Sequence, residues 1–124
     1  MYEPIIESGM RFDNTDAWRI EKSALYTSLS KGNDGFKVVE FIRVKDGNYI
    51  FVEAKSSFPN LHKPDSIENV EKNINIILNK FVHSLSILSS IHLRVNDVPE
   101  TEMPDAFYQL SKPSIHFVLV LHFP

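Results

Sequence analysis

The chain has 124 residues, a formal net charge of -3, 43% apolar residues and 23% charged residues, which is the composition of a globular protein and not of a disordered one. This length predicts a single domain over residues 1–124. The chain has no cysteine, which excludes disulfides and thiolate metal sites, and its acidic balance disfavours a protein that coats nucleic acid electrostatically. Weak or partner-assisted nucleic-acid binding is the most that this charge supports.

The sequence predicts a cytoplasmic protein with no attachment to a membrane. The first residues, MYEPIIESGMR, lack the basic start and the long apolar run of a signal peptide. The longest apolar stretch, IHFVLVLHF, is well short of the roughly 20 residues that a spanning helix requires.

Residues 1–17 are expected to be irregular, because Pro4, Gly9 and the polar segment FDNTD supply helix breakers and turn formers. The first regular element is expected at Trp18–Ser23. Its periodicity fits a strand and also the start of a helix that would run through Leu29. We prefer a strand followed by a short turn.

A β-hairpin, with strands at about 36–45 and 49–57, is predicted from the segment KDGN between two runs of β-branched and aromatic residues. With a two-residue type I′ turn, Glu40 lies opposite Glu53. Residues two apart in a strand share a face, so Lys55 lies on the same face as Glu53. A three-residue loop would instead move Glu40 to the opposite face.

Two carboxylates on one face of neighbouring strands repel each other unless a positive group lies between them. Lys55 is one such group, and a divalent cation is the other. The simpler alternative is that Glu53 and Lys55 form an ion pair on the strand surface, which contributes little to stability.

Glu40, the hairpin and the motif Glu53-Ala54-Lys55 resemble the acidic residue and E-x-K pattern of the restriction-endonuclease-like, or PD-(D/E)xK, nuclease superfamily. In that fold a hairpin presents the acids and the lysine at one end of a mixed sheet, and a helix and another strand follow. The resemblance implies an α/β fold of this type, with Glu40 and Glu53 as ligands of Mg²⁺ or Mn²⁺ and Lys55 as the residue that positions the attacking water. It also makes Glu21 a candidate third acid.

A narrower resemblance covers most of the chain. The segments ESGM, WRIEKSALY, VVEFI, FVEAKSSFPN and KFVHSLSIL together are similar to an uncharacterised bacterial protein family. This second resemblance implies no particular activity.

A long amphipathic helix is predicted at about 66–90, after a capping segment that contains Asp65 and Ser66. Its apolar residues recur at helical spacing and are expected to lie on the sheet. They are Ile67, Val70, Ile74, Ile77, Phe81, Leu85 and Leu88.

The C-terminal part is predicted to contain a short helix near Pro104–Leu110 and then a buried strand at about 115–122, because this strand is apolar on both faces. Since the sequence stops at Pro124, directly after this strand, we expect either that the domain is truncated or that a partner covers the strand. Exposed apolar surface would then favour a homo-oligomer.

Two functional classes follow from the sequence. The first is a metal-dependent nuclease that hydrolyses phosphodiester bonds in nucleic acid. The second is a noncatalytic nuclease-fold module that serves in interaction or as a scaffold. The first requires a divalent-cation site on the hairpin and an accessible groove above it, and the second requires neither.

Overall fold

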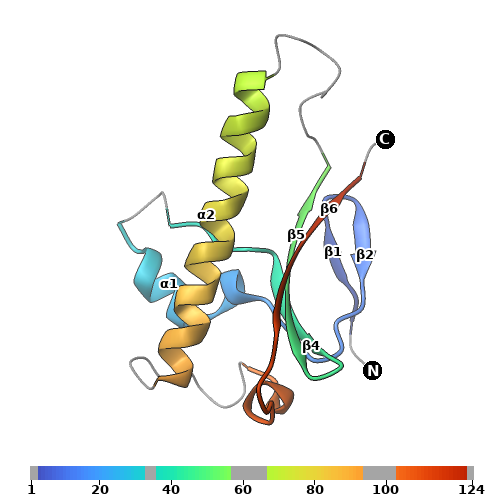
Figure 1. Cartoon of the computed structure of the whole chain (residues 1–124), viewed down its shortest axis with the longest axis vertical. Helices are drawn as coiled ribbons and strands as arrows, with labels where there is room; N and C mark the ends of the chain where they lie inside the picture. The colour runs from blue at the N-terminus through green and yellow to red at the C-terminus, as the bar shows by residue number, and fades with distance from the viewer. Residues whose placement is uncertain (1–2, 33–35, 57–66, 94–102, 123–124) are drawn as a thin grey trace.

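The structure is a computed structural model, and it describes residues 3–32, 36–56, 67–93 and 103–122. It confirms a mixed α/β fold built on a four-stranded sheet in the order β3-β4-β5-β6 (Figure 1). The strands are β3 (Ala17–Trp18), β4 (Phe41–Lys45), β5 (Asn48–Lys55) and β6 (Ile115–Leu121). Neighbouring strands are antiparallel except β5 and β6, which are parallel.

The sheet is covered on both faces. The long helix α2 (Ile67–His92) packs on one face through the main apolar core, which includes Ile42, Phe51 and Phe81. The small hairpin of β1 (Ile5–Glu7) and β2 (Met10–Phe12) packs on the other face. The sheet is therefore the middle layer, as the apolar character of both of its faces predicts.

The predicted turn and register of the central hairpin are confirmed. Lys45 pairs with Asn48, and the two loop residues, Asp46 and Gly47, have φ angles of 53° and 77°. Positive φ at both central residues defines the type I′ turn, and Asp-Gly is one of the few dipeptides that adopt it at low cost.

Strand β4 begins at Phe41, whereas the prediction placed its start several residues earlier. The reason is that the backbone of Lys37 and Val39 is hydrogen-bonded to side chains of α2 instead of to a strand. The Val39 N–H donates to Ser84 Oγ at 3.0 Å, and a hydrogen bond of 2.8 Å joins His83 Nδ1 to the Lys37 carbonyl. This segment therefore turns from the sheet toward the helix.

The predicted long helix is confirmed, but it is buried against the rest of the molecule only from Ile77 onward. Its buried residues are Ile77, Phe81, Ser84, Ile87, Leu88 and Ile91. Ile67 and Ile74, which were expected to face the sheet, are 63% and 43% exposed, because the first turns of α2 extend past the end of β5 (Figure 1).

By length and composition α2 is also apolar enough to cross a membrane, and it is the one described helix with this property. This is weak evidence for a membrane span, since the core helix of a soluble protein passes the same test.

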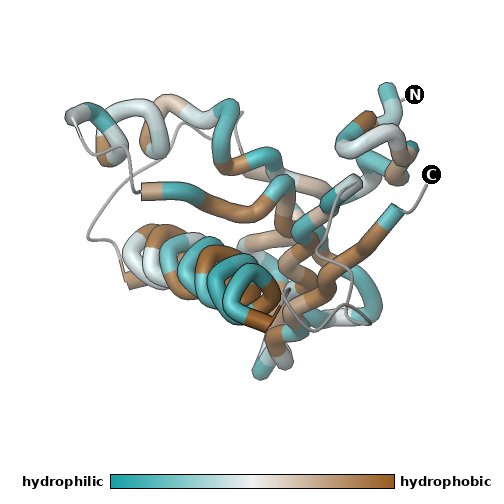
Figure 2. The backbone as a smooth tube through the Cα atoms, turned by 90° about the horizontal axis from the view of Figure 1, so that it is seen from above, coloured by the Kyte–Doolittle hydropathy of each residue, from teal (hydrophilic) through white to brown (hydrophobic). Residues whose placement is uncertain are grey.

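The C-terminal strand is confirmed as β6, but the prediction that it is buried is wrong. The strand is apolar along most of its length (Figure 2), and yet Ile115, Phe117 and Leu119 are 43%, 49% and 37% exposed. The physical reason is its place at the edge of the sheet. Phe117 stacks on Phe81 with ring centroids 4.7 Å apart, and no described residue covers the outer side of the strand.

The N-terminal predictions are mostly wrong. Residues 5–12 form the hairpin β1–β2 instead of irregular chain, with Ser8 and Gly9 at positive φ in its turn. The strand expected at Trp18–Ser23 is limited to the two residues of β3. A 3-10 helix η1 (Ile20–Lys22) and the helix α1 (Ala24–Ser30) follow, and α1 starts where Ser23 Oγ accepts a hydrogen bond from the Tyr26 N–H.

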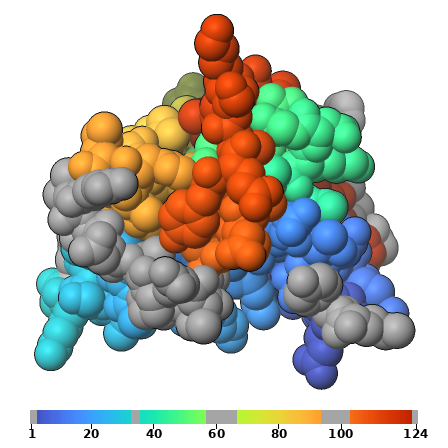
Figure 3. Space-filling model, turned by 90° about the horizontal axis from the view of Figure 1, so that it is seen from below, coloured from blue at the N-terminus to red at the C-terminus, as the bar shows by residue number. Residues whose placement is uncertain are grey.

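The short helix expected near Pro104 is present as the 3-10 helix η3 (Asp105–Tyr108). Seen from below, the segment around η3 lies between the C-terminal end of α2 and the β4–β5 hairpin (Figure 3). Phe107 of η3 belongs to the main core, and its carbonyl accepts a hydrogen bond of 2.8 Å from the Tyr49 hydroxyl.

Candidate functional site

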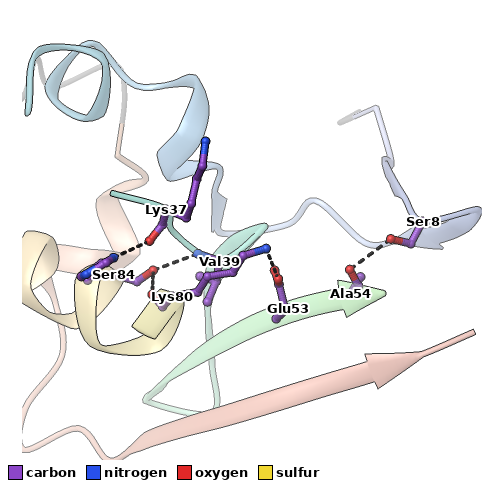
Figure 4. A network of polar contacts seen from close by, with 8 residues as sticks. Ser8, Lys37, Val39, Glu53, Ala54, Lys80 and Ser84 are labelled. Carbon is purple, nitrogen blue, oxygen red and sulfur yellow. Dashed lines mark hydrogen bonds and ion pairs between the residues drawn. The ribbon is translucent and has the colours of Figure 1, made fainter. Parts of the chain in front are cut away.

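Glu53, near the end of β5, is the centre of the candidate site. The residue is 0% exposed and lies on the face of the sheet that α2 covers. The Lys80 ammonium, from the middle of α2, forms an ion pair and hydrogen bond with Glu53 Oε2 (Figure 4). A strand and a helix that are distant in the sequence therefore meet in this ion pair.

The second oxygen of the same carboxylate has no hydrogen-bond partner among the described residues, and the Glu40 N–H, which lowers the pKa of this carboxyl, donates to the Val52 carbonyl. Glu53 Oε1 is buried and receives no hydrogen bond from any residue within the described ranges. Buried polar atoms are nearly always hydrogen-bonded in folded proteins, so each exception calls for an explanation. An acceptor oxygen of this kind suits a cation, a water molecule or a hydrogen-bond donor of a ligand.

Burial raises the pKa of the Glu53 carboxyl, because desolvation disfavours its charged form. The ion pair with Lys80 and the nearby charge of Lys55 act in the opposite direction. The upward direction shows that the two ammonium groups offset the burial only in part.

Glu40 lies one residue before β4. The first paired position of the hairpin is Phe41 with Val52. Glu40 was predicted to lie opposite Glu53 as a paired residue, but it lies just outside the paired positions. Its N–H still donates to the Val52 carbonyl at 3.1 Å, which holds it beside the end of β5.

The pKa of Glu40 is raised to about 7. Burial is the largest cause, followed by the charges of Glu53 and Glu7 and by a hydrogen bond between the Glu40 and Glu7 carboxyl groups. Glu40 and Glu53 are therefore electrostatic neighbours, as the hairpin register predicts.

Glu7 is an acid that sequence reasoning missed. It is the last residue of β1, and its carboxylate forms an ion pair with Arg19. Ser8, the next residue, donates a hydrogen bond of 3.0 Å to the Ala54 carbonyl, which fixes the tip of the β1–β2 hairpin against the end of β5 (Figure 4).

Lys55, the last residue of β5, is half-buried and close enough to lower the pKa of Glu53. Glu21 is exposed on η1, and no hydrogen bond or ion pair joins it to the acids of the site in the part of the chain that the structure describes. The third carboxylate at this site thus comes from Glu7 of β1.

Lys80 was also missed, although the sequence carries a signal for it. It is three residues after Ile77 and four before Ser84, both of which are buried, so it lies along the buried stripe of α2. A lysine in such a stripe indicates a buried acidic partner, because an unpaired charge there is costly.

A metal ion at this site would have few direct protein ligands. Among the described residues, no group of three or more histidine, cysteine, aspartate or glutamate side chains is placed to hold one. The pair Glu40 and Glu53 can supply carboxylate oxygens, and the remaining positions would fall to water or to a ligand.

The chain matches no protein-family model, no curated protein and no solved structure. The two resemblances therefore stay predictions.

Proposed function

We propose that this protein is a metal-dependent nuclease, in which Glu40 and Glu53 bind Mg²⁺ or Mn²⁺ and Lys55 positions the water that attacks a phosphodiester bond. The observation that supports it most is the buried Glu53 carboxylate, which keeps one oxygen unpaired beside a second carboxyl group. Carboxyl groups with shifted pKa values occur at functional sites more often than elsewhere.

The residues fit the proposed ion. Mg²⁺ prefers hard oxygen ligands, keeps several of its waters and is commonly held by one or two carboxylates together with substrate phosphate. Two carboxyl groups at one end of the sheet supply oxygen ligands of this type.

A bound Mg²⁺ would lower the pKa of a water molecule and stabilise negative charge on the phosphate oxygens. Two lysines of the chain have tasks around it. Lys80 holds Glu53 in one orientation through their ion pair, and Lys55 hydrogen-bonds to the attacking water. The water oxygen then forms a bond to phosphorus, the bond from phosphorus to the leaving oxygen breaks, and a proton ends on that oxygen.

The order of elements supports the proposal further. The hairpin β4–β5 is followed by α2 and then by β6, which joins the same mixed sheet next to β5. This is the order that the resemblance to the PD-(D/E)xK superfamily implies. The acids and Lys55 gather at one end of that sheet, also as the resemblance implies.

A second candidate function is a noncatalytic module with the same fold. The observation that favours it is the ion pair itself, because Lys80 already supplies a positive charge to Glu53. In that case the carboxyl groups and Lys80 form a structural network, and the protein serves as an interaction module or as a scaffold.

Calorimetric titration of Mn²⁺ separates the two functions. We expect binding to the wild-type protein, loss of binding in Glu53→Gln, and retention in Glu68→Gln, which removes an exposed carboxylate from the first turn of α2. The titration is repeated with a single-stranded 12-mer present, since substrate phosphate can complete such a site. A folded wild-type protein that binds no Mn²⁺ with or without the 12-mer would refute the nuclease proposal.

Mn²⁺ binding would then be followed by hydrolysis assays on single-stranded and duplex DNA and RNA, with EDTA as the negative control. Cleavage that requires the metal and disappears in Glu53→Gln and Lys55→Met is the expected result. Metal binding without cleavage of any of these substrates would favour the noncatalytic module.

A further inference from the structure

A second polar site adjoins the carboxyl groups. A hollow of about 270 Å³ is lined by Asn14, Ala17, Trp18, Arg19, Lys22 and Ser23. Arg19 connects it to the candidate active site, because its guanidinium forms the ion pair with Glu7, whose carboxyl group is close enough to raise the pKa of Glu40. Glu7 is thus a neighbour of both the hollow and the acids.

The cations of this hollow keep donors that the described protein does not use. The ion pair with Glu7 engages Arg19 through Nη2, while Arg19 Nε is buried and has no hydrogen-bond partner among the described residues. A guanidinium carries five N–H donors, and the Arg19 side chain is 32% exposed, so donors other than the buried Nε remain for a ligand. Lys22 is exposed at the hollow and forms no ion pair within the described ranges.

The other lining residues narrow the class of ligand. Ser23 Oγ has no donor left for a ligand, since its one O–H donates to the Ile20 carbonyl at 2.6 Å, and the oxygen also accepts from the Tyr26 N–H at 3.1 Å. Trp18 is 3% exposed, so its ring face is not available for stacking on a base. The hollow therefore offers cationic donors and the amide of Asn14, a set that suits an oxyanion.

We propose that this hollow binds a backbone phosphate of the nucleic-acid strand, next to the phosphodiester that is held at Glu40, Glu53 and Lys55. The inference rests on the proposed nuclease function. A strand that crosses both sites places one phosphate by the carboxyl groups and another by Arg19 and Lys22. Contacts to phosphate carry no sequence information, so this site adds affinity and register without base preference.

The proposal accounts for a feature that the overall charge leaves unexplained. A chain with a net charge of -3 repels nucleic acid on average, and the carboxyl groups of the candidate site offer it no attraction. Arg19, which is joined to those acids through Glu7, and the nearby Lys22 provide local attraction where the strand must lie.

Trp18 makes the hollow directly observable, because it is the single tryptophan of the chain and lines the site. Its fluorescence is followed while a dT 12-mer is added at low salt with EDTA present, so that the readout depends on neither metal nor cleavage. Lys22→Gln is compared with Lys31→Gln, which changes an exposed lysine at the end of α1 outside the hollow.

We expect the 12-mer to change the fluorescence of the wild-type protein and of Lys31→Gln equally. In Lys22→Gln the affinity should fall by about fivefold, and the slope of log K against log salt should decrease by about 0.7, the value for one phosphate contact on a single strand. Equal binding by the two lysine variants, or no binding by the wild-type protein, would overturn the inference. Inorganic phosphate that binds as tightly as the 12-mer would also overturn it, since the ligand would then be a free anion.

Failure of this inference and failure of the proposed function give different results. Mn²⁺ binding that is normal in Lys22→Gln, together with unchanged 12-mer affinity, would refute the phosphate site and leave the metal site intact. A wild-type protein that binds the 12-mer through Lys22 but never binds Mn²⁺ would refute the nuclease chemistry and retain the phosphate site.

Discussion

The ammonium of Lys80 on α2 neutralises the carboxylate of Glu53 on β5, which is 0% exposed. This ion pair joins the helix to the sheet at the end where the other acids lie. Removing one member of a buried pair costs much more than the pair itself contributes, because the remaining charge stays desolvated.

Lys80→Met should therefore lower the free energy of unfolding at pH 7 by about 3 kcal/mol. The matched control is Lys72→Met, which changes an exposed lysine on the same helix and should shift stability by about 0.5 kcal/mol or less. Urea denaturation followed by circular dichroism measures both. The double variant with Glu53→Gln should recover part of the loss, and equal effects of the two lysine variants would contradict the role given to Lys80.

The raised pKa of Glu40 predicts a stability that falls with rising pH. Its pKa is about 7 in the folded protein against an ordinary value of 4.5, so the folded state holds the proton more tightly between these values. Its contribution to stability is complete below pH 4.5 and is lost as the pH rises to about 7, with a slope of at most about 1.4 kcal/mol per pH unit.

Urea unfolding at several pH values in EDTA tests this linkage. Glu40→Gln should flatten the profile over that window and should be more stable than the wild-type protein at pH 8, because no carboxylate is then buried at this position. Glu68→Gln, at an exposed carboxylate, should keep the wild-type slope. A Glu40→Gln profile parallel to that of the wild-type protein would show that this group does not titrate as described.

Ser84→Ala should lower the free energy of unfolding far more than Ser86→Ala, which changes an exposed serine on the same helix. The Ser84 hydroxyl accepts the Val39 N–H at 3.0 Å and donates to the Lys80 carbonyl at 2.7 Å, and the residue is 0% exposed. Ser84→Ala leaves the buried Val39 N–H unpaired, which should cost about 2 kcal/mol. Ser86→Ala removes only an exposed bond to the Val82 carbonyl and should cost about 0.5 kcal/mol or less.

Thermal unfolding of these two variants measures the difference. Equal melting temperatures would mean that the contact between Val39 and Ser84 does not hold the segment before β4 against the helix. Mn²⁺ titration of Ser84→Ala would then show whether Glu40, which follows Val39 directly, still reaches the site.

The turn of the central hairpin should tolerate Asp46→Asn but not Gly47→Ala. Gly47 has a φ of 77°, and a β-carbon in this region costs about 1 kcal/mol, so Gly47→Ala should lower stability by that amount. Asp46→Asn should have little effect, because asparagine adopts positive φ readily. Denaturant midpoints compare the two variants, and an alanine variant as stable as the wild-type protein would argue against the type I′ geometry.

Local signals in the sequence predicted the centre of the fold well. Asp46-Gly47 specifies the turn and hence the register, and the apolar period after Asp65 specifies the long helix. The burial of β6 could not be predicted in this way, because it depends on which strand lies at the edge of the sheet.

The sequence predicted only the residues of the site that belong to the central hairpin. Glu40 and Glu53 are brought together by the turn between them, which is a local effect. Lys80, Glu7 and Arg19 come from the middle of α2, from β1 and from the chain after β3, and their approach to the hairpin depends on tertiary packing that no short sequence pattern encodes. The N-terminal hairpin escaped prediction because its turn is the less diagnostic pair Ser8-Gly9.

A protein whose metal ligands are held apart by their own charges commonly folds only when the metal arrives, and a chelator then unfolds it. This chain has its own counter-ion in Lys80, and Glu40 can hold a proton near neutral pH. Folding should therefore not require the proposed metal. EDTA should leave the protein folded, with the melting temperature that it has before any metal is added.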